Sequence, residues 1–254
     1  MTWAVVARNG PAHAANPIHT DAGARAAGFP AALVAGVTVH AWLTHPVVEH
    51  WGDEWLRGGG GEVRFRQPVF DRDHVTVPAH TGEDGALVVE AVVAGDARAT
   101  LVATPPATLS APALLPRTPR HDPFPPDAEV LTAVTDLGTI DQMIDGDWGA
   151  PYAADVGDDL GRYEQGDVVH PGVWIEVAHR ALTRNIALPA WVHTRSRYQF
   201  FDAILPPGIA VEVRSRVVEA RVRKGRDEIR LDVQIVHNGR VVVAVDHEAI
   251  IRFR

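Results

Sequence analysis

The segment LVAGVTVHAWLTHPVV, residues 33–48, opens an apolar run with a glycine and continues with apolar residues at helical spacing. Val37, Ala41 and then Thr44 or His45 recur on one side, which is typical of a helix with a wide buried face. This segment therefore predicts a long, mostly buried helix that begins at a glycine.

The same pattern returns in the second half of the chain. Residues 168–186 read VVHPGVWIEVAHRALTRNI, again with a glycine at the head of the run. Val173, Val177 and Ala181 follow each other at intervals of four residues and form an apolar stripe. We expect a second buried helix here, equivalent to the first.

Each predicted helix is followed by segments of alternating or β-branched residues, which indicate strands. After the first helix these segments are 62–65, 74–79, 87–93 and 97–103. After the second they are 191–201, 209–219, 229–236, 240–247 and 249–253. HNGR at 237–240 and RKGRDE at 223–228 are typical of hairpin turns. One helix followed by antiparallel strands, occurring twice, predicts an α+β fold whose two sheets join or face each other.

A proline-rich segment separates the two repeats. TPPATLSAPALLPRTPRHDPFPPD, residues 104–127, holds eight prolines in 24 residues, too many for a helix or for the interior of a strand. We therefore predict two units, Met1 to Ala103 and Ala128 to Arg254, with the segment as a stiff connection across the surface.

Composition excludes several classes of function. The 254 residues are 46% hydrophobic, enough for one large or two smaller cores, and the formal charge of -8 argues against nucleic acid as a partner. There is no cysteine, so disulfides, thiolate nucleophiles and cysteine-based metal sites are excluded. No apolar run approaches the roughly 18 residues of a membrane span. We expect a cytoplasmic protein without a membrane anchor.

The segment before the first helix carries a more specific pattern. Asn16, Pro17, Ile18 and His19 are followed by Gly-Phe and then by the glycine that opens the helix. This order resembles the signature of the MaoC-like acyl dehydratases and R-specific enoyl-CoA hydratases, in which Asp-x-Asn-Pro-Ile/Leu-His precedes Gly-Phe and a His-Gly. The resemblance is close over about 25 residues. It implies a double hotdog fold, in which antiparallel sheets wrap around the two central helices.

The resemblance also implies an activity. These relatives act on acyl groups carried as thioesters on coenzyme A or an acyl carrier protein. It implies that His19 is the acid–base group, that Asn16 supports it, and that backbone N–H groups of Gly36 and Val37 stabilise an enolate oxygen. From the residues alone, Asn16 can equally cap a helix that begins at the proline, His19 can be a packed histidine, and Gly36 can serve helix–sheet packing.

Two positions depart from the family pattern. Ala14 stands where the family has its catalytic aspartate, and Ala35 stands where a histidine or serine usually precedes the helix glycine. One acid–base group typically contributes about 10² to 10⁴ in rate, so ordinary hydration should suffer. His13 is next to the altered position and is a candidate for another polar group that contacts substrate.

Three functions remain open at this point. The first, which we favour, is conjugate addition to an α,β-unsaturated acyl thioester, or the reverse elimination. The nucleophile is water or, in preference, an amine such as an amino acid. The second is thioester hydrolysis, and the third is a degenerate site that only binds acyl chains or assembles with a partner. The thioester itself is the activated group, so no bound cofactor is implied. Association into a homodimer is left open.

The second half offers weaker candidates. The segment HPG at 170–172 is equivalent to residues 34–36, so His170 lies near the start of the second helix and is a weaker candidate for the site. Tyr152 and Trp174 are candidates for the walls of the acyl pocket. The remaining histidines do not form a local zinc-binding pattern, so we expect no metal site; they include His40, His45, His50, His179 and His193.

Overall fold

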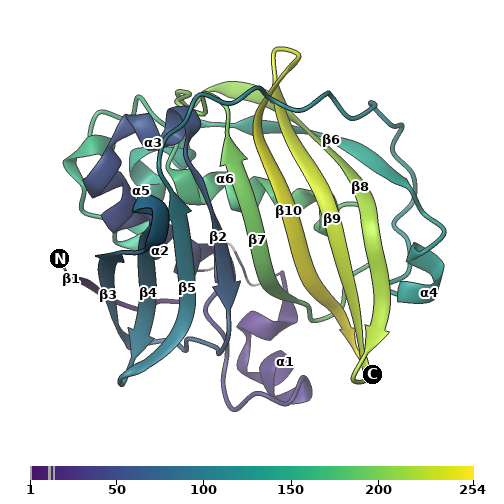
Figure 1. Ribbon diagram of the computed structural model, residues 1–254. Coiled ribbons are helices and arrows are strands. Elements are labelled where there is room, and N and C mark those ends of the chain that lie inside the picture. Colours follow the sequence, from purple (N-terminus) through teal and green to yellow (C-terminus); the bar gives the residue numbers. More distant parts are fainter. Residues whose placement is uncertain (1, 11–12, 14) are drawn as a thin grey trace.

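The strands form one continuous sheet (Figure 1). The computed structural model describes residues 2–10, 13 and 15–254. Its strands in that part of the chain are β1 (Thr2–Val6), β2 (Gly60–Phe65), β3 (His74–Thr81), β4 (Leu87–Val93), β5 (Asp96–Thr104), β6 (Asp136–Ile144), β7 (Val192–Phe200), β8 (Ile209–Arg223), β9 (Arg226–His237) and β10 (Arg240–Phe253). Their order in the sheet is β1-β3-β4-β5-β2-β7-β10-β9-β8-β6.

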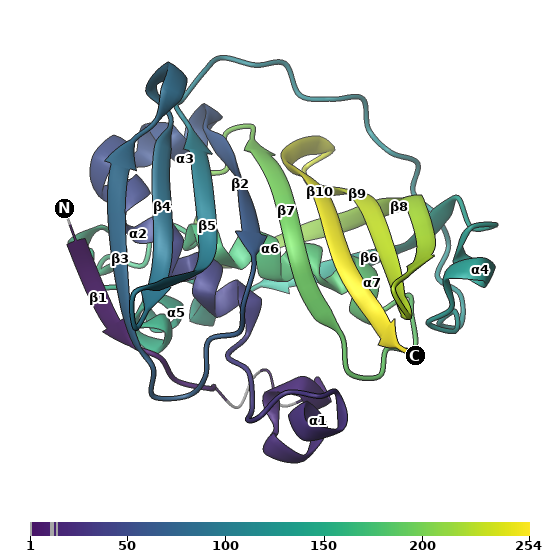
Figure 2. The same cartoon turned by 60° about the horizontal axis from the view of Figure 1, so that its bottom comes forward.

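The helices lie mainly on one side of this sheet, which curves around them (Figures 1 and 2). The α-helices are α1 (Asp21–Ala26), α2 (Gly36–Trp51), α3 (Asp53–Gly58), α4 (Ala128–Leu131), α5 (Ala150–Val156), α6 (Pro171–Ala178) and α7 (Arg180–Thr183). Short 3-10 helices are η2 (Pro17–His19), η3 (Glu83–Gly85), η4 (Gly146–Trp148) and η5 (Gly161–Tyr163). Among the described residues, none of the helices has the length and apolar character needed to span a lipid bilayer.

The two halves of the chain meet at the centre of the sheet. β2 of the N-terminal half pairs antiparallel with β7 of the C-terminal half, from Gly60 opposite Gln199 to Arg64 opposite Arg195. The half-sheets therefore join edge to edge, which was one of the two arrangements allowed by the sequence. A joined sheet leaves the central edge of neither half exposed.

The two central helices pack directly against each other. A Cβ atom at Gly172, in the first turn of α6, would lie only 2.8 Å from Cβ of Ala41 on α2. Glycine is therefore required for the close approach of the helices. α2 begins at Gly36 as predicted, whereas α6 is shorter than predicted. The N–H of His179 is shared between the carbonyls of Ile175 and Glu176, and the regular helix ends there.

Most strands occupy the predicted segments. Both predicted hairpin turns are present, with positive φ at Lys224 and Gly225 in one and at Asn238 and Gly239 in the other. β10 is one strand with an irregularity between Glu248 and Ala249, where the sequence predicted two strands. The sequence analysis missed β1 and β6, which form the two edges of the sheet.

The proline-rich segment at 104–127 runs along the outside of the molecule, as the teal strand-free trace in Figure 2 shows. It is attached to the sheet through Leu115, whose side chain is buried. The N–H of Leu115 donates to Oε1 of Gln234 at 2.8 Å, and Nη1 of Arg214 donates to the Leu115 carbonyl at 2.8 Å. The segment is thus bound to the sheet between its two ends and does not merely connect the two halves.

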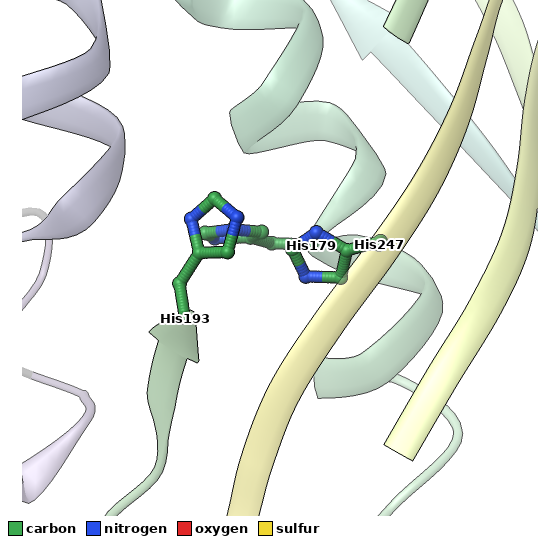
Figure 3. Close-up of side chains that lie close together, drawn as sticks. All are labelled: His179, His193 and His247. Atoms are coloured by element: carbon green, nitrogen blue, oxygen red, sulfur yellow. The ribbon is translucent and has the colours of Figure 1, made fainter. Parts of the chain in front are cut away.

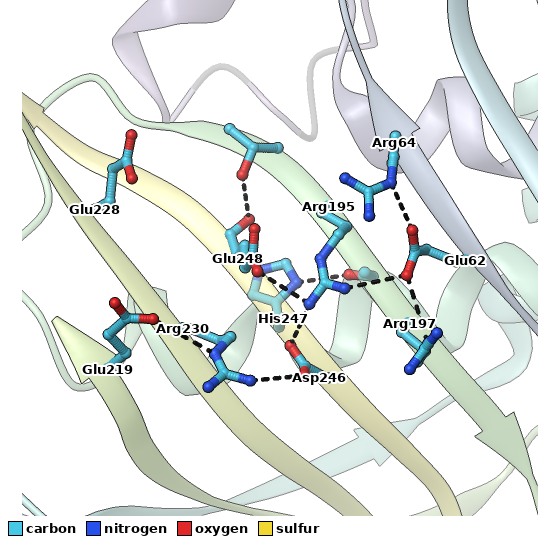
Figure 4. A network of polar contacts seen from close by, with 12 residues as sticks. Glu62, Arg64, Arg195, Arg197, Glu219, Glu228, Arg230, Asp246, His247 and Glu248 are labelled. Carbon is cyan, nitrogen blue, oxygen red and sulfur yellow. Dashed lines mark hydrogen bonds and ion pairs between the residues drawn. The ribbon is translucent and has the colours of Figure 1, made fainter. Parts of the chain in front are cut away.

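Charged residues join the halves on the outer face of the sheet (Figure 4). Arg195 on β7 donates to Glu62 on β2 at 3.1 Å and to Asp246 on β10 at 2.9 Å. The same guanidinium lies 2.9 Å from Glu248. One arginine therefore contacts three carboxylates that belong to both halves.

Candidate functional site

A cavity of about 610 Å³ opens at the junction of the two halves. Its walls come from the segment before α2, the first turn of α2, the end of α6 and the start of β7. Five of the predicted site residues line it: His13, Asn16, His19, Gly36 and Val37. These are the described residues that we predicted for the site from the N-terminal motif, and the structure brings them together in one cavity.

His19 is held in a defined orientation. Nδ1 of His19 lies 2.8 Å from the carbonyl oxygen of Leu33, so this nitrogen carries the proton and donates it. Nε2 then bears the lone pair of the neutral ring, and it lies 3.5 Å from the side-chain nitrogen of Asn16. Burial lowers the pKa of His19, and the bond to Leu33 opposes this shift. The ring is therefore a neutral base at physiological pH.

Asn16 has both roles that the sequence allowed. Its Oδ1 accepts from the N–H of Ile18 at 3.3 Å and so caps η2. Its Nδ2 donates to the carbonyl oxygen of Trp191 at 3.0 Å, which connects the motif to the C-terminal half, and the same amide nitrogen faces His19. The asparagine thus fixes the local helix and the position of the imidazole together.

The first turn of α2 borders the cavity. No side chain caps this end of the helix, because Ala35 is the N-cap residue, and Gly36 and Val37 line the cavity. A Cβ at Gly36 would meet Nδ1 of His193 at 3.4 Å and Phe65 at 3.6 Å. These distances are close to ordinary contact, so packing alone does not demand a glycine at this position. The start of a helix without a side-chain cap leaves backbone N–H groups unpaired at the positive end of the helix dipole.

His13 adjoins this arrangement, and its ring centroid is 5.9 Å from that of His19. Its Nε2 lies 3.5 Å from the hydroxyl of Thr38. Burial, and secondarily the nearby His19, lower the pKa of His13 to about 4. Ala14, the position of the family aspartate, lies outside the described residues.

The three candidates of the C-terminal half lie elsewhere. Neither Tyr152 nor Trp174 nor His170 is among the residues that line the cavity. His170 is fully buried, and its Nε2 lies 3.0 Å from Asp158, whose other oxygen is 2.9 Å from Nδ1 of His45. Nδ1 of His170 accepts from the N–H of Gly172 and caps α6. This histidine therefore belongs to a buried structural network.

The C-terminal half contributes other side chains to the cavity. Glu176, Arg180 and Trp191 line it, and burial raises the pKa of Glu176 while Arg180 opposes the shift. Arg184 and Arg226 of this half, and Arg66 of the N-terminal half, are exposed residues that also line the cavity and form no ion pair with any described residue. The sequence analysis did not single out these residues, since the end of α6 and the segment before β7 approach the motif only in the folded chain.

Three buried histidines lie close together next to the cavity (Figure 3). They are His179 after α6, His193 on β7 and His247 on β10. Their ring centroids are 4.5 to 4.8 Å apart. Burial lowers the pKa of each, to about 3 for His247, so the rings are neutral. His179 and His193 line the cavity. The sequence analysis considered His179 and His193 but did not find a set of ligands for them, because His247 comes from a distant strand.

No protein-family model matches the chain, and no curated protein matches it in sequence. Solved structures match its fold over almost the entire length. A MaoC-like dehydratase is 10% identical with a TM-score of 0.61, covering 100% of this chain and 98% of the other. A Mycobacterium tuberculosis protein with a double hotdog fold is 14% identical, with a TM-score of 0.59 and coverage of 98% and 95%. A Lactobacillus plantarum protein assigned as an oleoyl thioesterase is 11% identical, with a TM-score of 0.52 and coverage of 100% and 98%. The predicted double hotdog fold is confirmed.

Proposed function

We propose that this double hotdog protein is an enzyme that adds a nucleophile to an α,β-unsaturated acyl thioester, or catalyses the reverse elimination. The observation that carries the proposal is the orientation of His19. Its Nδ1–H is engaged by the Leu33 carbonyl, which leaves Nε2 as a base in the same cavity as the uncapped end of α2. A base and a set of fixed N–H donors are the two features that conjugate addition requires.

The reaction follows from these two groups. The nucleophile forms a bond to the β-carbon, the electrons of the double bond move to the α-carbon, and the thioester oxygen takes up the negative charge as an enolate. The N–H groups of Gly36 and Val37 stabilise that oxygen. His19 accepts the proton of the nucleophile at Nε2 and returns it to the α-carbon. Atoms and charge balance without any redox partner.

An amine, such as the amino group of an amino acid, is the favoured nucleophile. Among the described residues that line the cavity, Glu176 is the one carboxylate, and Arg180 lies 3.9 Å from it. Activation of water calls for one more strong base than the described residues of the site provide. A neutral amine, in contrast, attacks without being deprotonated first. The amine nitrogen then loses its proton to His19 after the bond has formed.

The carrier of the acyl group is coenzyme A or the phosphopantetheine of a carrier protein. The exposed guanidinium groups of Arg66, Arg184 and Arg226 at the cavity wall are suited to phosphate groups. Phe29, Phe65 and other apolar side chains supply surface for the acyl chain.

Thioester hydrolysis is the second candidate, because a protein assigned as a thioesterase shares the fold over its full length. In this reaction His19 would direct water to the carbonyl carbon, and the thiol would leave. The two reactions give different products: hydrolysis releases free thiol and retains the double bond, whereas addition retains the thioester and saturates the double bond.

Mass spectrometry of crotonyl and longer enoyl thioesters tests the proposal. Coenzyme A and pantetheine esters are incubated with the protein, with and without glycine or other amines. We expect an amine adduct whose rate of formation falls by about 10² to 10⁴ in His19→Gln. The matched control is His80→Gln, at an exposed position on β3.

The products decide between the candidates. A water adduct would change the nucleophile but retain conjugate addition. Free thiol together with the unsaturated acid would establish the hydrolase. Unaltered thioesters in every reaction would reject both enzymatic functions and favour a protein that only binds acyl chains.

A further inference from the structure

The cluster of His179, His193 and His247 is unusual because each ring retains an unpaired buried nitrogen. Nε2 of His179, Nδ1 of His193 and Nε2 of His247 have no hydrogen-bond partner among the described residues. The three side chains are 8%, 5% and 0% exposed. Buried polar atoms normally find partners, so an unpaired nitrogen on each of three adjacent rings calls for a ligand.

The remaining nitrogens of two rings meet at one hydroxyl. Oγ of the buried Ser196 lies 2.8 Å from Nε2 of His193 and 2.8 Å from Nδ1 of His247. A hydroxyl oxygen has two lone pairs and can accept an N–H from each ring. In that arrangement Nδ1 of His193 and Nε2 of His247 each bear the lone pair of a neutral ring. Outer partners of this kind orient metal-binding imidazoles.

We propose that His179, His193 and His247 bind a divalent transition-metal ion, Zn²⁺ in preference to Mg²⁺ or Ca²⁺, at the wall of the cavity. Each histidine offers one ring nitrogen that lies within 4.8 Å of a ring nitrogen of the other two. Tetrahedral zinc with imidazole ligands needs nitrogens about 3.4 Å apart, so the three side chains must move closer together to hold one ion. A ligand set made only of imidazole suits Zn²⁺ and disfavours cations that prefer oxygen.

The position of the cluster indicates what the ion would face. His179 and His193 line the cavity, and Nδ1 of His193 points toward the first turn of α2, 3.4 Å from where a Cβ of Gly36 would be. Three protein ligands leave a fourth position of a tetrahedral ion for water or substrate. An ion there would act as a Lewis acid toward an oxygen at the cavity wall. The inference goes beyond the proposed function, which uses His19 and needs no metal.

Metal titration of the full chain in the absence of any thioester tests the site directly. The protein is dialysed against a chelator and titrated with Co²⁺, whose visible absorption reports tetrahedral coordination, and Zn²⁺ then competes. We expect one Co²⁺ per chain, displaced by one equivalent of Zn²⁺, and a higher melting temperature with metal. Mg²⁺ at the same concentrations should change neither signal.

Variants locate the ion. Replacing any one of the three histidines by glutamine should weaken Zn²⁺ binding by more than about 100-fold, and Ser196→Ala by about 10- to 100-fold. The matched control is His40→Gln. This histidine is also fully buried, and it pairs with Tyr198 at 3.0 Å, outside the cluster. Its binding should equal that of the unmodified protein.

Absence of saturable Co²⁺ or Zn²⁺ binding by the unmodified chain overturns the inference, and so does binding that is equally tight in all three histidine variants. Circular dichroism identifies any variant that fails to fold; in that case the titration of the unmodified chain and of Ser196→Ala decides. Because no thioester is present, this result is independent of the test of conjugate addition.

Discussion

At the scale of single residues, the protonation state of His19 governs the proposed chemistry. Burial lowers its pKa from 6.5, and His13, the neighbouring titratable group, also has a lowered pKa of about 4. Protonation of Nε2 removes the base, so activity falls as the pH drops through the lowered pKa. We expect the acid limb of kcat/KM to have its midpoint below pH 6.5. A rate profile from pH 4 to 8 in the unmodified protein measures this; a midpoint at or above 6.5 would contradict the role of His19.

The local motif could be predicted from the sequence because its residues act over short distances along the chain. Asn16 caps the 3-10 helix that contains His19, and Gly36 opens the central helix, as the order of residues indicates. The partners from the other half could not be predicted. The Trp191 carbonyl accepts from the Asn16 amide because β2 pairs with β7 and brings the two halves together. Within the C-terminal half, His247 reaches the other two histidines because β10 pairs with β7.

At the scale of elements, the approach of α6 to α2 depends on one glycine. An alanine at Gly172 would place its Cβ 2.8 Å from Cβ of Ala41 and 3.1 Å from its Cα. Overpacking of this kind costs about 1 to 3 kcal/mol of unfolding free energy. We expect Gly172→Ala to lower stability by about that amount in urea titrations.

Two further variants separate this clash from the general effect of replacing glycine. Gly146→Ala is the matched control, since a Cβ there meets nothing within 4 Å. Ala41→Gly removes the opposing atom, so the double variant with Gly172→Ala should recover part of the lost stability. Equal losses in the single and double variants would assign the effect to the backbone instead of the helix contact.

Some helices and strands are easier to predict from the sequence than others. The hairpins at 224–225 and 238–239 follow from their turn residues, and α2 follows from its glycine and apolar stripe. The edge strands β1 and β6 are held by pairing with β3 and β8, so their own residues carry little of the signal. The early end of α6 likewise reflects its surroundings in the fold.

At the scale of the whole molecule, Arg195 links the two halves on the outer face of the sheet. Burial raises the pKa of Glu62, but hydrogen bonds from Arg64 and Arg195 outweigh this effect and hold the pKa below its ordinary value. A carboxyl with a depressed pKa stabilises the fold above its unfolded pKa, and that contribution is lost as the pH falls toward the folded pKa. The joined sheet should therefore weaken in mild acid.

Removal of the guanidinium should reveal this contribution. Arg195→Met leaves Glu62, Asp246 and Glu248 without their shared cation, and we expect a loss of about 2 kcal/mol in unfolding free energy at neutral pH. Arg197→Met is the matched control: Arg197 contacts Glu62 at 3.4 Å, but its side chain is 72% exposed, so its loss should cost under about 0.5 kcal/mol.

Because the three carboxylates repel each other without the arginine, the stability deficit of Arg195→Met should shrink as they are protonated below about pH 4. Urea titrations of the three proteins between about pH 7 and pH 3 measure it, and a deficit independent of pH would show that Arg195 acts through packing alone.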